Sequence, residues 1–166
     1  MKKPHDALVH LMDQANNVSP PTPADAVYFD APQPWSEEGD WRNTQVTAHG
    51  ILEKGYSGSQ TFQYRRPDLG LLFKDVIVTV VIPHHNATTE DIVAELNNQF
   101  DKLDLYVGDM VHEPVPDGAT SYVLKADPTS LYYIGQVEVI VERVLIDISK
   151  DFTVTALQGF DYVQLP

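Results

Sequence analysis

Two stretches of alternating apolar and polar residues predict β-hairpins. In the first, Val46, Ala48 and Gly50 alternate with polar neighbours, and after the turn residues Tyr56-Ser57-Gly58 the alternation resumes over Gln60–Arg66. Such alternation is typical of strands with one buried face. The second stretch has the same order, with a strand at Ser121–Lys125, the turn Tyr133-Ile134-Gly135 and alternation over Val137–Arg143.

The two hairpin segments align when residues 45–66 are placed on residues 122–143. Four residues are then identical: Val46 and Val123, Tyr56 and Tyr133, Gly58 and Gly135, Arg66 and Arg143. Two interpretations remain open here. The segments could descend from a duplication, or any two hairpins could look this similar, because convincing repeats come in several copies.

Between the hairpins the pattern predicts a buried strand and then a helix. The run Val76–Ile82 is apolar on both faces, which favours a place in the middle of a sheet, and Pro83 ends it. A helix is predicted over about 88–100, because Thr88 or Thr89 can cap it and its apolar residues share one face. That face comprises Ile92, Val93, Leu96 and Phe100.

Residues 1–42 predict an N-terminal proline-rich arm. Residues 6–15 have helical spacing, which indicates a short helix or a frayed terminus. The run Ser19-Pro20-Pro21-Thr22-Pro23 favours an extended path. The aromatic residues on such an arm need a surface to dock on, either on their own domain or on a neighbouring protein.

These elements predict an α+β or mainly-β fold. We expect a mostly antiparallel sheet with one packed helix at about 88–100 and an extended N-terminal arm. The arm would be residues 1–42, followed by a single β-rich domain at 43–166. The residues Phe152, Val154 and Ala156, followed by Tyr162 and Leu165, predict one or two final short strands in that domain.

Composition narrows the classes of function. The formal net charge is −13, from 24 acidic and 11 basic residues, so the surface repels phosphate backbones and anionic membranes. We therefore expect neither nucleic acid nor membrane as a partner, and a basic protein surface as a favourable one. No apolar run approaches the roughly 20 residues that span a bilayer, and we expect no export signal.

No motif predicts catalysis or a cofactor. The chain has no cysteine, which excludes thiol chemistry and thiolate metal sites. His84-His85 is a weak metal candidate, because adjacent residues on an extended chain point to opposite sides. The acidic cluster Glu37, Glu38 and Asp40 could be a weak cation site or an anchor for a basic neighbour, and a solvated loop is the alternative. We expect no enzyme activity, no metal and no cofactor.

Candidate interface residues are aromatic or basic side chains on the arm and at the hairpin ends. They are Tyr28, Phe29, Trp35, Trp41, Tyr56, Arg65, Arg66, Tyr133 and Arg143. The arginines could pair with acidic residues of another subunit, or with Asp68 and Asp147 of the same chain.

Several short segments resemble virion structural proteins of giant tailed bacteriophages related to phiKZ. The resemblance covers residues 43–145 and departs from the family pattern at Arg66-Pro67. It rests on Asn43-Thr44-Gln45-Val46-Thr47, Tyr56-Ser57-Gly58, Tyr64-Arg65-Arg66-Pro67-Asp68-Leu69, the capped helix with Leu96-Asn97-Asn98-Gln99-Phe100, and Ala126-Asp127-Pro128-Thr129-Ser130-Leu131 with Tyr133-Ile134-Gly135.

The resemblance implies a non-enzymatic structural component of a tailed-phage particle, in the head, neck or tail. Such a protein would be made in the host bacterial cytoplasm, reside in the virion and form homo- or hetero-oligomers with other virion proteins. The alternative is a small carbohydrate- or ligand-binding module that uses Trp35 and Trp41 as stacking plates.

Overall fold

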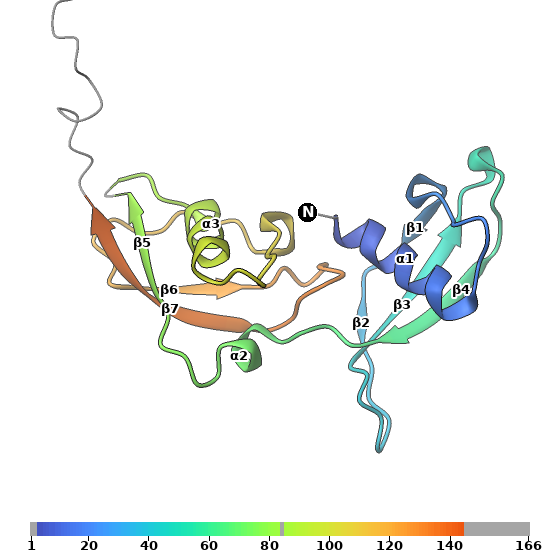
Figure 1. Ribbon diagram of the computed structural model, residues 1–166, viewed down its shortest axis with the longest axis horizontal. Coiled ribbons are helices and arrows are strands. Elements are labelled where there is room, and N and C mark those ends of the chain that lie inside the picture. Colours follow the sequence, from blue (N-terminus) through green and yellow to red (C-terminus); the bar gives the residue numbers. More distant parts are fainter. Residues whose placement is uncertain (1–2, 84, 145–166) are drawn as a thin grey trace, which may run out of the picture.

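The strands are divided between two sheets in two lobes, which a short linker joins (Figure 1). The computed structural model describes residues 3–83 and 85–144. The fold is α+β, as the sequence predicts. In the described part of the chain, no helix has the length and apolar character needed to cross a bilayer.

The first lobe is a four-stranded sheet with helix α1 packed against it. Its central strand β3 pairs with β4 on one side and with both β1 and β2 on the other, always antiparallel. Apolar residues of α1, β1 and β3 form a small core of Val9, Val27 and Ala48. The elements are α1 (Pro4–Asn16), β1 (Val27–Phe29), β2 (Gln33–Pro34), β3 (Thr44–Gly50) and β4 (Ser59–Tyr64).

The N-terminal segment differs from the predicted extended arm. The predicted short helix is present as α1, but the proline-rich part that follows supplies β1 and β2 to the sheet, so it packs on its own chain. The domain boundary predicted at residue 42 therefore falls inside the first lobe. Strands of three and two residues are too short to show alternation, and a proline is compatible with a sheet edge.

The second lobe is a three-stranded sheet in the order β5-β7-β6, with α3 packed against β5. The predicted hairpin is confirmed: β6 and β7 are antiparallel, while β5 and β7 are parallel. Thr88 caps α3 in a capping box with Asp91, so the predicted helix is also confirmed. The elements are α2 (Leu69–Leu72), β5 (Thr79–Pro83), α3 (Thr89–Gln99), β6 (Ser121–Lys125) and β7 (Gln136–Val144).

Strand β5 corrects one prediction. The run Val76–Ile82 was expected in the middle of the sheet, but β5 lies at the edge and β7 is central. Ile77 lies outside the strand with 84% of its surface exposed, and Val81 points to solvent. The apolar run therefore contains exposed side chains as well as buried ones, so it did not indicate a strand buried on both faces. The predicted single sheet is likewise two sheets, and residues 145–166, with the strand expected near Phe152, lie outside the described residues.

The larger core belongs to the second lobe. Fully buried Ile82, Ile92, Leu96 and Val139 join β5, α3 and β7. Leu69 and Phe73 add the short helix α2 to the same core. Three 3-10 turns complete the described elements, at Ala24–Ala26, Leu52–Lys54 and Val107–Asp109.

Candidate functional site

The two lobes meet where the chain leaves β4 and enters α2. Backbone hydrogen bonds hold this crossing on the second lobe: the Leu69 amide donates to the Ile134 carbonyl over 2.9 Å, and the Ile134 amide donates to the Pro67 carbonyl over 3.0 Å. The turn before β7 is therefore hydrogen-bonded directly to the linker. Backbone contacts as well as side-chain contacts set the position of one lobe relative to the other.

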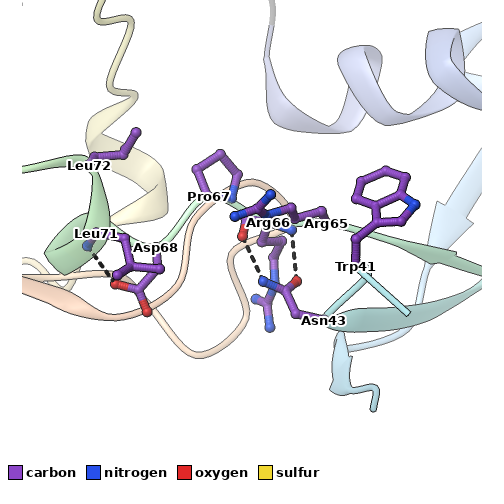
Figure 2. Close-up of a pocket in the computed structure, with 8 residues that line it drawn as sticks. All are labelled: Trp41, Asn43, Arg65, Arg66, Pro67, Asp68, Leu71 and Leu72. Atoms are coloured by element: carbon purple, nitrogen blue, oxygen red, sulfur yellow. Dashed lines mark hydrogen bonds between the residues drawn. The ribbon is translucent and has the colours of Figure 1, made fainter. Parts of the chain in front are cut away.

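Arg66 is the central side chain of this junction. Only 6% of its surface is exposed, and its Nε donates to Thr44 Oγ1 over 2.9 Å while Nη1 donates to the Ser130 carbonyl over 2.6 Å. Burial lowers the pKa of its guanidinium. Asn43 fixes the backbone of Arg66 through two hydrogen bonds of 2.8 Å, drawn in Figure 2. One arginine thus ties β3 of the first lobe to a turn of the second.

Tyr64 makes a parallel connection from the last residue of β4. Its hydroxyl donates to the Leu131 carbonyl over 2.8 Å, one residue away from the carbonyl that Arg66 binds. Burial raises the pKa of Tyr64 to about 12, so the hydroxyl remains a donor across the physiological range.

An open cavity of about 500 Å³ lies beside this junction. Figure 2 shows Trp41 at its first-lobe end and Leu71 and Leu72 at its second-lobe end. These three side chains are 70%, 63% and 48% exposed. The cavity is lined by Trp41, Asn43, Arg65, Arg66, Pro67, Asp68, Leu71 and Leu72.

Two smaller cavities extend this one along the boundary between the lobes. A cavity of about 140 Å³ shares Arg65 and Pro67 with the first and reaches Leu8 and Leu11 of α1. A cavity of about 120 Å³ shares Pro4, Ala7 and Tyr132 with the second. We call these three adjoining cavities the junction groove.

The charge around the largest cavity differs from that of the whole molecule, because Arg65 and Arg66 line it with Asp68. Arg65 is exposed in it, and within the described residues its side chain has no hydrogen bond or ion pair. Asp68, the acid next to it, accepts a hydrogen bond from the Leu71 amide at the start of α2. Arg65 is thus a free cation between apolar side chains, on a chain whose formal net charge is −13.

A family described as a family of unknown function (DUF7941) matches residues 1–166, the full length of the chain. The chain belongs to the DUF7941 family. No curated protein and no solved structure matches it. The family description names no activity, so the chemistry of this DUF7941 chain has to be inferred from its own residues.

The structure brings together four of the nine candidate interface residues of this DUF7941 chain. Trp41, Arg65 and Arg66 line the largest cavity of the junction groove, and Tyr133 lines the smallest. Their exposures differ, because Arg66 and Tyr133 are buried whereas Trp41 and Arg65 are exposed. Only the exposed pair can contact a partner without a rearrangement.

Four others lie elsewhere on the first lobe. Tyr28 stacks on His49 with ring centroids 4.7 Å apart, and Phe29 packs against the small core. The Trp35 indole donates to Asp40 Oδ2 over 3.3 Å, which fixes it within its own loop. Tyr56 is 37% exposed beside the β3–β4 turn.

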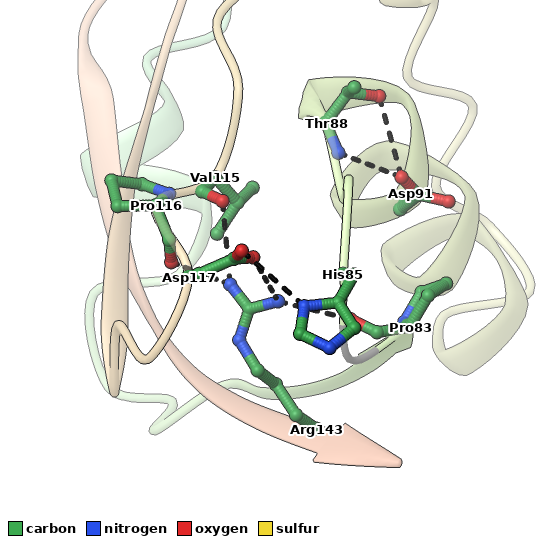
Figure 3. A network of polar contacts seen from close by, with 8 residues as sticks. All are labelled: Pro83, His85, Thr88, Asp91, Val115, Pro116, Asp117 and Arg143. Carbon is green, nitrogen blue, oxygen red and sulfur yellow. Dashed lines mark hydrogen bonds and ion pairs between the residues drawn. The ribbon is translucent and has the colours of Figure 1, made fainter. Parts of the chain in front are cut away.

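Arg143 lies near the end of β7, within a network of polar contacts (Figure 3). Its guanidinium donates to the Pro83 carbonyl over 3.1 Å and to the Pro116 carbonyl over 2.6 Å, and it faces Asp117 at 3.8 Å. His85 also approaches Asp117, with 3.4 Å between Nδ1 and Oδ2. These contacts tie the end of β7 to the end of β5 and to the loop that contains Pro116 and Asp117.

The acidic and histidine clusters do not form a metal centre in the described part of the chain, where no group of three or more potential ligands occurs. His84 lies outside the described residues. In the acidic loop, hydrogen bonds from Arg42 hold the pKa of Asp40 far below its usual range, so this carboxylate has its partner within the loop.

Sequence reasoning missed several residues of the groove. Leu71 and Leu72 follow the N-capping Asp68 in a helix of four residues. Such a short helix cannot bury successive leucines on one face, so the sequence could have indicated that some of them are exposed. Tyr106, Asp109 and Tyr132 carry no such signal, because only the approach of α1 places them beside a cavity.

Proposed function

We propose that this protein is a non-enzymatic component of a tailed-phage particle, and that it docks a partner protein in the junction groove. The exposed apolar side chains at both ends of the largest cavity carry this proposal. Trp41, Leu71 and Leu72 flank the exposed Arg65 there. Exposed apolar side chains gathered in a concave surface are typical of binding sites.

The composition of the groove supports a protein partner. Tryptophan and arginine are the residues most enriched among those that dominate binding energy at interfaces. The largest cavity is open, the second shares lining residues with it and the third shares lining residues with the second, an arrangement along the lobe boundary that suits an extended segment. Arg65 favours a carboxylate next to the apolar side chains of that segment.

The assignment to a phage particle rests on the resemblance of residues 43–145 to virion structural proteins. The segment Tyr64-Arg65-Arg66-Pro67-Asp68-Leu69 is part of that resemblance, and its residues 65–68 also line the largest cavity of the junction groove. The strongly acidic composition fits a partner with a basic surface elsewhere in its contact.

Binding measurements test the groove. Proteins encoded by neighbouring genes are purified and titrated against this chain by calorimetry. Leu71→Ala is expected to weaken the affinity of the true partner about tenfold, because it removes an exposed apolar side chain that would be buried in the interface. Leu52→Ala is the matched control: Leu52 is 74% exposed and lies outside the groove, so affinity should not change.

Mass spectrometry of purified particles tests the location. The chain should be present at a fixed copy number, and a Leu71→Ala/Trp41→Ala double variant should be lost from the particles. Absence of this protein from wild-type particles, or full incorporation of the double variant, would contradict the proposal.

A carbohydrate is the second candidate ligand, because Trp41 lines the largest cavity beside polar Asn43 and Arg65. Trp35 lies outside that cavity, so only one tryptophan could stack on a sugar there. A glycan-array signal that disappears with Trp41→Ala would favour this function over the docking of a protein.

A further inference from the structure

The smallest cavity of the junction groove combines acidic and aromatic side chains. It lies where the start of α1 approaches the second lobe (Figure 1) and measures about 120 Å³. That volume is smaller than typical small-molecule pockets of roughly 300–1,000 Å³ and suits one side-chain head group. The cavity is lined by Pro4, Ala7, Asp104, Tyr106, Asp109, Tyr132 and Tyr133.

Asp109 lines this cavity and carries one oxygen without a hydrogen-bond donor among the described residues. Only 3% of its surface is exposed; Oδ1 accepts a hydrogen bond from Ser130 Oγ over 2.7 Å, while Oδ2 has no partner among the described residues. Burial raises the pKa of this carboxyl group. A buried carboxylate oxygen without a donor costs folding free energy, which a cationic ligand would recover.

Ser130 fixes the geometry around Asp109. Its hydroxyl donates to Asp109 and accepts from the backbone amides of Tyr132 and Tyr133 over 3.1 and 3.0 Å. The carboxylate and the two tyrosines are therefore held by one side chain, and the cavity wall is organised without a ligand.

Aromatic rings form the rest of the wall. The Tyr132 and Tyr133 rings are tilted by 51° with centroids 4.7 Å apart. The Tyr106 ring lies against Gly108, where an added Cβ would be 2.4 Å from Cε1. Burial is the main cause that raises the pKa of Tyr133, followed by the charges of Tyr132, Asp109 and Asp104. The carboxylates of Asp109 and Asp104 therefore both act on the Tyr133 hydroxyl.

Carboxylates together with tyrosine faces bind organic cations, through ion pairing and cation–π attraction. Among the described residues, no lysine, arginine or histidine lines the cavity. The positive end of α1, at Pro4, offsets part of the negative charge, which favours a monovalent cation. A planar guanidinium can stack on tyrosine while its N–H groups reach a carboxylate, which an ammonium group does less well.

We propose that this cavity takes the guanidinium group of an arginine side chain from the partner that docks in the junction groove. The source of the arginine rests on the proposed function, whereas the preference for a guanidinium rests on Asp104, Asp109 and the three tyrosines alone. The cavity thereby selects a basic residue at one end of the docked segment, at the opposite end of the groove from Trp41 and Leu71.

The preference for a guanidinium is tested with N-acetyl-arginine amide as the probe, titrated at low salt into ¹⁵N-labelled full-length protein. Saturable shifts are expected at the amides of Tyr106, Asp109, Tyr132 and Tyr133. N-acetyl-citrulline amide, the neutral analogue of the same shape, should not shift them. Equal shifts with citrulline, or none with arginine, would overturn the proposal.

Two variants sharpen this titration. Asp109→Asn should weaken arginine binding about tenfold, the loss expected for one charge-assisted hydrogen bond. Glu142→Gln is the matched control, because it removes one exposed carboxylate on β7, outside the cavity, and should leave affinity unchanged. Gly108→Ala retains both carboxylates but displaces the Tyr106 ring, and should also weaken binding. Unchanged affinity in Asp109→Asn would refute the role of this carboxylate.

A separate experiment measures how tightly the partner protein binds. Asp109→Asn should reduce its affinity as well, and replacing the critical arginine of the partner should abolish the difference between wild type and Asp109→Asn. If arginine amide binds but partner affinity is the same in both, the cavity serves a free guanidinium compound instead, and the partner as its source is refuted. Failure of the Leu71→Ala test alone would count only against docking in the groove.

Discussion

The two lobes share a hairpin but complete it differently. Their antiparallel pairs start at equivalent positions in the sequence, with Thr44 and Ser59 in the first lobe matching Ser121 and Gln136 in the second. In the first lobe, β1 and β2 pair with the first hairpin strand, antiparallel. In the second, β5 pairs with the second hairpin strand, parallel.

The equivalent arginines show what this difference does. Arg66 and Arg143 both donate to backbone carbonyls, but Arg143 binds loops of its own lobe whereas Arg66 binds the other lobe. The first lobe has a small core and depends on the junction, while the second buries an extensive core of its own. Matching sequence at a hairpin end therefore does not imply a matching structural role.

The largest expected effect contrasts the second-lobe core with the face of α1 at the junction. Leu96→Ala should lower the free energy of unfolding by about 4 kcal/mol, because Leu96 is fully buried in the second-lobe core. Leu8→Ala should cost about 2 kcal/mol, since Leu8 already borders a cavity of the junction groove. Urea denaturation of both variants checks the order. Equal losses would mean that Leu8 is packed as tightly at the junction as Leu96 is in the second-lobe core.

Arg66→Leu tests the dependence of the first lobe on the junction. Losing two buried hydrogen bonds should cost about 2 kcal/mol, and hydrogen exchange should quicken in β3 before it does in β7. Arg65→Leu, the exposed neighbour, is the control and should change stability by less than about 0.5 kcal/mol. Simultaneous loss of protection in β3 and β7 would show that the lobes unfold as one unit.

The equivalent hairpin glycines give a smaller contrast. Gly58 and Gly135 both have positive φ, at 84° and 76°. Gly58→Ala should cost about 1 kcal/mol, from left-handed backbone strain alone. At Gly135 a Cβ would also lie 2.7 Å from the Asp68 carboxylate that caps α2, so Gly135→Ala should cost about 2 kcal/mol. Thermal unfolding of the two variants measures the difference, and equal costs would mean that Asp68 moves away freely.

The smallest effect concerns Asp109, whose pKa is raised by burial. The folded state then holds its proton to higher pH than the unfolded state, so stability falls as pH rises from the ordinary pKa to the raised one. Ser130 opposes this shift and Asp127 adds to it. Asp109→Asn should flatten that part of the stability curve, measured by denaturation between about pH 4 and pH 8. An unchanged slope would assign it to other groups.

Some elements followed directly from the sequence, and others could not. Alternation located β3, β4, β6 and β7, and Thr88 with its acidic first turn located α3, because each depends on neighbours within one element. Strands β1 and β2 are too short for a pattern, and the edge position of β5 depends on which strand occupies the other side of β7. The sequence predicted only part of the candidate site. Trp41 and Arg65 were candidates because they are aromatic and basic, whereas nothing in the sequence distinguished Asp109 from the other acidic residues.

The sequence by itself determined the positions of the alternating strands and of the helix cap, the absence of cysteine and the strong negative charge. Tertiary structure alone decided that the lobes meet around Arg66 and that the leucines of α2 and Trp41 line one cavity. It also decided that Asp109 lies beside tyrosines with one oxygen, Oδ2, that has no donor among the described residues. The physical reason is distance along the chain. Periodicity reports a residue's neighbours within one turn or strand, whereas the contact between Arg66 and Ser130 spans 64 positions and exists only after both lobes have folded.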